Sequence, residues 1–236
     1  MNATSVRKRS LSVGLASALC LFVFGVPISQ IQAETVPNIQ GGNEQREPGG
    51  TRGNDCTAGE APLTALLPGT STPGLTTAAS PTFFFYLPEN SAEGAEFVLY
   101  DEKSEAIYEK QVTVPTTEGV VSISIPTDPE VPELKVESNY YWTFALVCDY
   151  DDRATDEYVQ GQIQRVELSP DLTTEIENAT VRDRVALYAD AGIWYDTLTT
   201  LAQLRRENPT DPLLERNWVD LLQSVGLDKI AREPLL

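Results

Sequence analysis

The hydrophobic pattern changes its period near residue 169, and this change constrains the fold more than any other feature of the sequence. From Cys56 to about Leu168, apolar and polar residues alternate, and Gly, Pro, Asn and Asp interrupt the pattern at short intervals. Alternation of this kind is typical of antiparallel strands. After Leu168, apolar residues recur every three to four positions, as on one face of a helix. The sequence therefore predicts an α+β chain by segments, with an antiparallel β region followed by a small helical region.

Seven strands are predicted in the β region, and the sixth best indicates how they pack. The predicted ranges are Pro62–Leu67, Thr82–Leu87, Glu96–Asp101, Ala106–Val114, Gly119–Ile125, Tyr140–Cys148 and Tyr158–Glu167. Because side chains alternate along a strand, one face of the sixth strand carries a large aromatic area. The residues on this face are Tyr140, Trp142, Phe144 and Leu146. Such a face belongs at the centre of a β-sandwich, which we predict over residues 56–168.

A tyrosine at the start of the sixth strand indicates the kind of sandwich. Leu134 stands six residues before Tyr140, which resembles the tyrosine corner of immunoglobulin-like and fibronectin-type domains, where a tyrosine hydroxyl bonds back to nearby backbone. We therefore expect an immunoglobulin-like sandwich. Cys148 lies eight residues after Tyr140 rather than two, so the inter-sheet disulfide of antibody domains is not expected.

The helical region, residues 169–236, opens with two capping signals. Ser169 precedes Pro170, and Thr180 precedes Asp183 by three residues. Serine and threonine are preferred N-cap residues, and proline fits the first helical position. Helices are therefore predicted after both signals.

The spacing of five residues in this region resembles a tetratricopeptide repeat, which is a helical hairpin. The residues that stand where the repeat has its tyrosine, turn glycine, second-helix aromatic, apolar residue and closing proline are Tyr188, Gly192, Trp194, Leu201 and Pro209. Thr197 departs from the pattern, since the repeat usually has alanine there. One copy is visible, so we expect one hairpin capped by a further helix.

The N-terminal segment has the pattern of an export signal. A basic cluster at residues 7–9 precedes an apolar run over residues 11–26, and Ala33 ends a small-residue cleavage site. The run is shorter than the roughly 20 residues of a spanning helix, so we predict a signal peptide over residues 1–33 and no membrane span after its removal. Lipidation at Cys20 is an alternative, but this residue sits inside the run rather than at its end.

Residues 34–55 offer almost no apolar side chains to bury and are rich in glycine and proline. Such a composition does not support a packed element, so we predict a disordered tether. The protein should therefore work in the periplasm or outside the cell.

The chain is strongly acidic, with a formal net charge of -18. Removal of residues 1–33 takes away basic residues only, so the mature protein is more acidic still. This charge repels phosphate backbones and anionic head groups, which argues against nucleic acid or a membrane surface as the main partner. An envelope protein or a polysaccharide is the expected partner.

Two cysteines, Cys56 and Cys148, remain after residue 33. Thiols tend to oxidise outside the cytoplasm, so one disulfide is the simplest use of the pair. Two unpaired thiols without a role are the alternative.

Four segments spread over the mature chain resemble a family of exported cyanobacterial proteins that is defined only as a domain of unknown function. These segments are Gly74–Tyr86, Phe97–Asp101, Trp142–Asp149 and Ala186–Asp196. The resemblance implies a cyanobacterial envelope context and supplies no activity, cofactor or catalytic residue. At the position of Ser80, members of the family often carry histidine.

The sequence contains no histidine. This excludes Ser-His-Asp and Cys-His catalysis and histidine-based zinc sites. No phosphate-binding loop, dinucleotide fingerprint or nucleophile elbow is present either, so no cofactor is predicted. A glycosidase that uses two carboxylates is the enzyme class that remains, and we expect a protein that is not an enzyme.

The densest acidic cluster is a weak candidate for calcium binding. It comprises Asp149, Asp151, Asp152 and Asp156. Oxygen ligands on a loop suit calcium, but the spacing lacks the glycine and glutamate of a helix-loop-helix site. A solvated acidic loop is the favoured interpretation.

Aromatic residues suggest two interaction surfaces. Phe84 and Tyr86 share one face of a predicted strand and form either a ligand platform or a surface that the helical segment covers, and we favour the cover. Trp194 and Tyr195 lie at the turn of the predicted hairpin. We expect an exported, non-catalytic protein-interaction module that uses the hairpin Ala186–Leu204. The alternatives are a polysaccharide-binding module that uses Phe84 and Tyr86, and a carboxylate-pair hydrolase.

Overall fold

The computed structural model describes residues 45–48, 56–69 and 73–236. In this part of the chain, strands precede helices, as the change of period near residue 169 predicts. The strands are β1 (Thr57–Ala58), β2 (Thr64–Ala65), β3 (Gly74–Thr76), β4 (Thr82–Leu87), β5 (Glu89–Asn90), β6 (Gly94–Tyr100), β7 (Ala106–Val112), β8 (Gly119–Ser124), β9 (Asn139–Val147) and β10 (Glu157–Arg165). A short 3-10 helix, η1 (Arg153–Thr155), lies between β9 and β10, and the α-helices that follow β10 are α1 (Pro170–Asn178), α2 (Val181–Asp190), α3 (Trp194–Glu207) and α4 (Pro212–Ser224).

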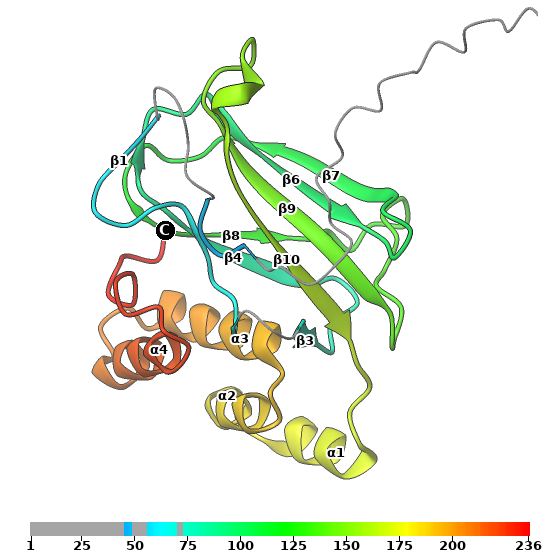
Figure 1. Ribbon diagram of the computed structural model, residues 1–236. Coiled ribbons are helices and arrows are strands. Elements are labelled where there is room, and N and C mark those ends of the chain that lie inside the picture. Colours follow the sequence, from blue (N-terminus) through cyan, green and yellow to red (C-terminus); the bar gives the residue numbers. More distant parts are fainter. Residues whose placement is uncertain (1–44, 49–55, 70–72) are drawn as a thin grey trace, which may run out of the picture. The chain divides into compact units, whose positions relative to one another are not determined.

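The described strands form three sheets (Figure 1). The largest has the order β3-β10-β9-β6-β7, the second has the order β2-β4-β8, and β1 pairs with β5 in a small third sheet. All pairs between these strands are antiparallel except one, because β3 runs parallel to β10. The fully antiparallel arrangement expected from the sequence is therefore wrong at this edge, where a three-residue strand is too short to show a pattern.

Aromatic side chains pack the two larger sheets face to face. Phe85 of β4 stacks on Phe144 of β9 with ring centroids 4.1 Å apart, and Phe83 lies 4.8 Å from Phe97 of β6. Trp142 is 1% exposed within the same cluster. The inward face predicted for the sixth strand is confirmed, and aromatic burial of this kind supplies most of the driving force for packing the two sheets.

The helices begin where the capping signals predict. Ser169 Oγ accepts a hydrogen bond of 3.3 Å from the backbone N–H of Leu172, and Thr180 Oγ1 accepts one of 3.2 Å from Asp183. Each bond satisfies one of the free N–H groups at a helix start. The next predicted feature, an αα-hairpin, corresponds to α2 and α3.

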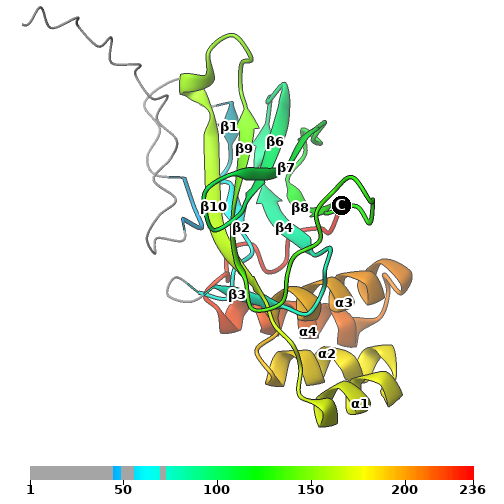
Figure 2. The same cartoon turned by 90° about the vertical axis from the view of Figure 1, so that its right-hand side faces the viewer.

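The helices and sheets share one hydrophobic core. Phe84, which points away from the space between the sheets, meets Trp218 of α4 at a centroid distance of 6.3 Å. The predicted helical cover is therefore confirmed for Phe84, and Tyr86 is buried beside Glu233 of the C-terminal segment, with both side chains at most 3% exposed. The described residues form one compact unit. Figure 2 shows α3 and α4 against one end and one side of the strands. The change near residue 169 thus marks a change of secondary structure within one core.

Residues 45–48, which lie within the tether predicted over residues 34–55, are bonded to the folded part. Gln45 exchanges two backbone hydrogen bonds of 3.1 Å with Gln160 of β10, and the carbonyl of Arg46 accepts one of 2.9 Å from Ala65 of β2. The Arg46 guanidinium donates to the carbonyl of Val225 at 2.9 Å. Backbone hydrogen bonds and the Arg46 guanidinium, rather than buried apolar side chains, attach this segment to the fold. The predicted signal peptide and the rest of the tether lie outside the described residues.

Tyr140 makes the backbone hydrogen bond that its spacing from Leu134 predicts. Its hydroxyl accepts a bond of 2.9 Å from the backbone N–H of Lys135, while Leu134 is buried. This bond ties the connection before β9 to the start of that strand. Within the described residues, no helix has both the length and the apolar character needed to cross a membrane.

Candidate functional site

The first turn of α3 docks on the strands through three consecutive side chains. Trp194 Nε1 donates to the carbonyl of Leu66 at 2.9 Å. The hydroxyl of Tyr195 accepts a hydrogen bond of 3.0 Å from Trp142 Nε1 and donates one of 3.3 Å to the carbonyl of Gln162. These bonds satisfy polar groups that would otherwise be buried without partners, which stabilises the docked helix. We call this contact the strand–helix junction.

Two glycines make room for the aromatic pair of the strand–helix junction. A Cβ at Gly161 would lie 2.4 Å from Trp142 Cζ2, and a Cβ at Gly74 would lie 2.5 Å from Tyr195 Cε2. Both distances are shorter than any ordinary van der Waals contact. The tryptophan and tyrosine rings therefore rest directly on the backbone of β10 and β3.

Asp196 completes the strand–helix junction by binding the end of β3. One of its carboxylate oxygens accepts hydrogen bonds from Thr76 Oγ1 at 2.7 Å and from the backbone N–H of Thr77 at 3.1 Å, and the other accepts from Thr77 Oγ1. A carboxylate in the first turn of a helix is also favoured by the helix dipole. Its bonding capacity is thus directed at the protein's own backbone and hydroxyl groups.

A pocket of about 110 Å³ opens beside Asp196, and its lining includes Ser80, Tyr188 and Tyr195. Burial raises the pKa of Tyr188, and the charge of Asp196 adds to this effect. The pocket is well below the roughly 300 Å³ at which small-molecule sites begin, so it suits a few water molecules better than a substrate.

The interaction residues chosen from the sequence lie in the interior. Trp194, Tyr195 and Tyr86 are 7%, 2% and 2% exposed. Trp194 and Tyr195 are packing residues because the first turn of α3 faces the sheets, and Tyr86 is buried on β4. Asp196, which lies beside Trp194 and Tyr195 in the strand–helix junction, had no predicted role, although it belongs to one of the segments that resemble the family.

Tyr86 lies in an acidic setting on the outer side of β4. Burial, the charges of Glu233 and Glu118, and a hydrogen bond with Glu118 raise the pKa of Tyr86 to about 12. Burial and the charge of Glu118 also raise the pKa of Glu233. Tyr86 is consequently held as a neutral phenol, and the two glutamates form a like-charged pair near it.

The acidic loop after β9 uses its carboxylates to shape the backbone. Asp149 Oδ1 accepts from the backbone N–H of Asp151 at 2.8 Å, and Asp152 Oδ1 accepts from Ala154 at 3.2 Å. Such side-chain bonds two residues along the chain are typical of turns. Asp149 and Asp152 thus act as turn-forming residues.

Asp156 binds the same loop from its other end. It accepts a hydrogen bond of 2.5 Å from Arg153 Nε and one of 3.3 Å from the backbone N–H of Cys148. In the described ranges, no group of three or more histidine, cysteine, aspartate or glutamate residues is arranged to hold a metal ion. The four candidate calcium ligands are therefore not brought together as a ligand set.

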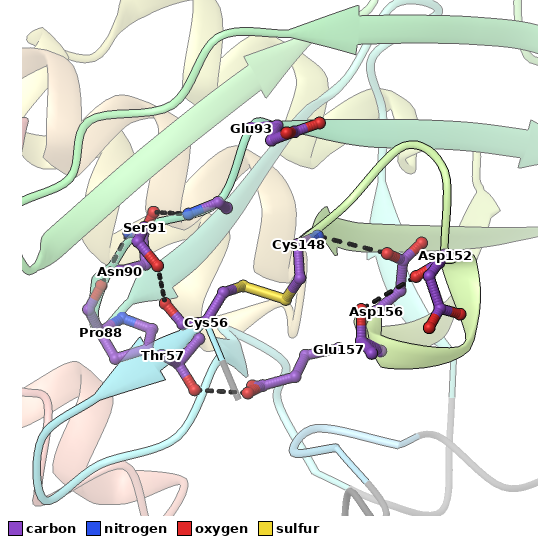
Figure 3. The surroundings of a disulfide bond; sticks show 12 residues. Cys56, Thr57, Pro88, Asn90, Ser91, Glu93, Cys148, Asp152, Asp156 and Glu157 are labelled. Atoms are coloured by element: carbon purple, nitrogen blue, oxygen red, sulfur yellow. Dashed lines mark hydrogen bonds between the residues drawn. A yellow bond between two sulfur atoms is a disulfide. The ribbon is translucent and has the colours of Figure 1, made fainter. Parts of the chain in front are cut away.

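A disulfide lies beside this loop (Figure 3). Cys56 and Cys148 are bonded, with their Cα atoms 5.4 Å apart. The carbonyl of Cys56 accepts a hydrogen bond of 2.7 Å from the backbone N–H of Ser91, and Thr57 Oγ1 donates to the buried carboxylate of Glu157. The bond attaches the start of the sandwich to the end of β9, as the two-cysteine count predicts.

The outer face of the five-stranded sheet is a further surface, which was not among those predicted from the sequence. Outward positions alternate with buried ones along β9 and β10, and they carry uncharged side chains. These outward residues are Tyr141, Thr143 and Ala145 on β9 and Tyr158, Gln160, Gln162 and Gln164 on β10. The signal was available, because the alternation that places Trp142 inward also places its neighbour Tyr141 outward.

The described structure is thus a mixed α+β domain in which helices brace a two-sheet core. A family model described as Domain of Unknown Function (DUF928) matches residues 47–235. The chain belongs to this family. The match supports the uncharacterised domain family expected from the four segments. No curated protein matches the chain.

Proposed function

We propose that this protein is an exported, non-catalytic envelope protein that acts as an interaction module and binds another protein or a polymer. Export is supported by the basic cluster at residues 7–9, the apolar run after it and the small-residue site at Ala33. A cyanobacterial envelope setting is supported by the family resemblance. Fractionation of the producing cell tests export, since a periplasmic or extracellular product that begins at Glu34 is expected and a cytoplasmic product that retains residues 1–33 would overturn it.

The absence of catalysis is supported by how the functional groups are used. The chain has no histidine for proton transfer. Asp196 accepts three hydrogen bonds from Thr76 and Thr77, and Asp149 and Asp152 of the acidic loop accept backbone hydrogen bonds that form turns. These groups hold backbone in place, which is a structural use of residues that an enzyme would direct at a substrate.

An immunoglobulin-like fold is part of the proposal, and strand order supports it. The order β2-β4-β8 facing β10-β9-β6-β7 corresponds to the ABE and GFCC′ sheets of that fold. The bond between Tyr140 and the backbone of Lys135 corresponds to its tyrosine corner. Domains of this architecture commonly serve recognition.

A tetratricopeptide-like hairpin formed by α2 and α3 is supported by Gly192, which has a φ of 72° in the turn between them. Thr197 replaces the usual alanine, and its Oγ1 donates to the carbonyl of Ile193 at 2.8 Å. Because Trp194 is buried against the strands, the hairpin serves mainly as a brace. This weakens the hairpin as the partner surface.

The observation that carries the binding function is the outer face of the five-stranded sheet. In Figure 1 this sheet faces the viewer, and no helix of the described part crosses it. Tyr158 is 39% exposed on this face. Interfaces are enriched in tyrosine and depleted in charge at their centres, and this face has both properties.

Affinity capture from envelope extract tests the proposal. The bait is the exported chain, and the face variant carries Tyr158→Ala with Gln162→Ala. Capture of a partner by the wild type and its loss in the face variant are expected. Leu213→Ser is the matched control, because Leu213 is 54% exposed on α4, away from the sheet. Equal capture by the face variant, or loss in the control alone, would overturn this face as the binding surface.

A further inference from the structure

We infer that the outer face of the five-stranded sheet binds an uncharged polysaccharide. This inference rests on the proposed binding function and names the class of partner. The face offers three properties that such a ligand requires. These are aromatic rings spaced along the strands, amide groups beside them, and outward positions on β9 and β10 without formal charge.

The strand register places the tyrosines at two ends of the face. Tyr100 of β6 is the register partner of Tyr141 of β9, and Tyr141 in turn pairs with Gln162 of β10. Tyr158 pairs with Ala145, four residues along β9 from Tyr141. At the ordinary rise of a strand, this offset is about 13 Å. One aromatic pair and one exposed tyrosine are thus separated by a stretch of polar sheet.

Tyr150 extends the aromatic end of the face near Tyr158. Its hydroxyl lies 2.6 Å from the position that a Cβ on Gly94 would take, and Gly94 belongs to the outward phase of β6. The ring therefore lies over the sheet at a glycine, although the residue belongs to the loop after β9. Tyr150 remains 45% exposed and Tyr158 39% exposed. Both rings are available to a ligand.

Amide and hydroxyl side chains accompany the tyrosines along the strands. Thr143 of β9 lies between the levels of Tyr158 and Tyr141, Gln162 of β10 is level with Tyr141, and Gln164 is the next outward residue beyond it. An amide group both donates and accepts hydrogen bonds, as do the hydroxyl groups of a sugar. Tyrosine presents an apolar ring and a polar hydroxyl, which match the C–H faces and hydroxyl edges of a pyranose. The composition fits a polyol rather than an apolar ligand.

This face carries less charge than the rest of the chain. The outward positions of β9 and β10 carry no charged residue, although the chain has a formal charge of -18. On β6, Glu96 is paired with Arg153 at 2.9 Å, and Glu109 stands on the edge strand β7. The acidic protein repels an anionic polymer, and a cationic partner would gain little from the uncharged part of the face that β9 and β10 form. The complementary ligand is therefore neutral.

Binding to defined polysaccharides tests this inference. The exported chain is titrated with uncharged glucans, mannans and xylans and, separately, with a carboxylated polysaccharide such as alginate. We expect binding to at least one uncharged polymer and none to alginate. In the face variant, Tyr158→Ala with Gln162→Ala, the Kd should rise about tenfold, because one ring contact and one amide contact are removed. Leu213→Ser should bind as the wild type does.

Thermal unfolding of each variant shows whether a loss of binding comes from unfolding. The face variant should melt as the wild type does, because both changed residues lie outside the core. Binding to alginate alone, or unchanged affinity in a folded face variant, would overturn the inference. No binding to any polysaccharide, with capture of a protein that the face variant loses, would overturn the polysaccharide but preserve the proposed function. Failure of both assays would overturn both.

Discussion

The two outer faces of the paired sheets carry aromatic side chains but differ in what covers them. On β4, Phe84 and Tyr86 are at most 3% exposed because α4 and the C-terminal segment lie over them. On β10, Tyr158 remains 39% exposed. The helices brace the smaller sheet, and no helix of the described chain covers the larger one. Outward aromatic residues on a strand therefore indicate a surface that something covers. The tertiary structure decides whether the cover is a helix of the same chain or is left to another molecule.

The largest effect should come from removing the tryptophan that joins both sheets and the strand–helix junction. Trp142→Ala should lower the free energy of unfolding by roughly 3–5 kcal/mol, since a buried aromatic ring and its bond to Tyr195 are lost. Urea denaturation followed by fluorescence or circular dichroism measures this. Tyr141→Ala, one residue away on the outer face, is the control and should cost far less. Similar losses in both variants would contradict the contrast between the faces.

The disulfide should have the next largest effect. Cys148→Ser opens a covalent loop with a sequence separation of 92. The chain-entropy model gives a loss of roughly 4 kcal/mol for a loop of this length. Denaturation of the wild type with and without reductant should reproduce the difference, while the variant should not respond to reductant. A wild type that is equally stable when reduced would show that the bond adds nothing to the sandwich.

A smaller loss should follow from weakening the carboxylate at the strand–helix junction. Asp196→Asn replaces one acceptor oxygen by an amide that cannot accept from Thr77, so roughly 1–3 kcal/mol of stability should be lost. Asp190→Asn on the exposed end of α2 is the matched control and should change the melting temperature little. If the two variants melt alike, the junction does not hold the helices in place.

Most of the fold was predictable because its main elements are long and regular. The seven predicted strands correspond to β2, β4 and β6–β10, and the capping residues Ser169 and Thr180 locate two helix starts. The strands β1, β3 and β5 were missed because elements of two or three residues are too short to show an alternating pattern. The parallel pairing of β3 depends on contacts between residues far apart in sequence.

The site was harder to predict than the fold. Trp194 and Tyr195 stood out by residue type, but their burial depends on how α3 meets the sheets. Gly74 and Gly161 leave room for the rings of Tyr195 and Trp142, which come from other strands or helices. A local sequence pattern cannot show such a contact between distant residues. The outward residues of β9 could be predicted, because they follow directly from the inward ones. Tyr141 nevertheless had no predicted role.

The smallest effect should be a pH dependence on the covered side. Burial and Glu118 raise the pKa of Glu233 above its ordinary value of 4.5. The folded protein therefore binds this proton more tightly than the unfolded chain, so the group favours folding at low pH and this contribution is lost as pH rises through the raised pKa. Glu233→Gln should raise the melting temperature slightly at neutral pH, and the gain should vanish well below pH 4.5.

Melting curves over a pH series check this expectation. Glu137→Gln, on an exposed loop, serves as the control and should shift the curve equally little at all pH values. A Glu233→Gln variant that is destabilised at neutral pH would show that the ionised carboxylate makes a favourable contact there.

Residues 45–46 give the fold a mechanical property. Gln45 is held to β10 by a pair of main-chain hydrogen bonds, and Arg46 is bonded to both Ala65 of β2 and the carbonyl of Val225 after α4. A pull from the N-terminal side would therefore act first on a clasp, formed by Gln45 and Arg46, that is attached to both sheets. Because the clasp is bonded to strands and to the end of a helix, a pulling force would be distributed over both rather than separating one edge strand from its sheet.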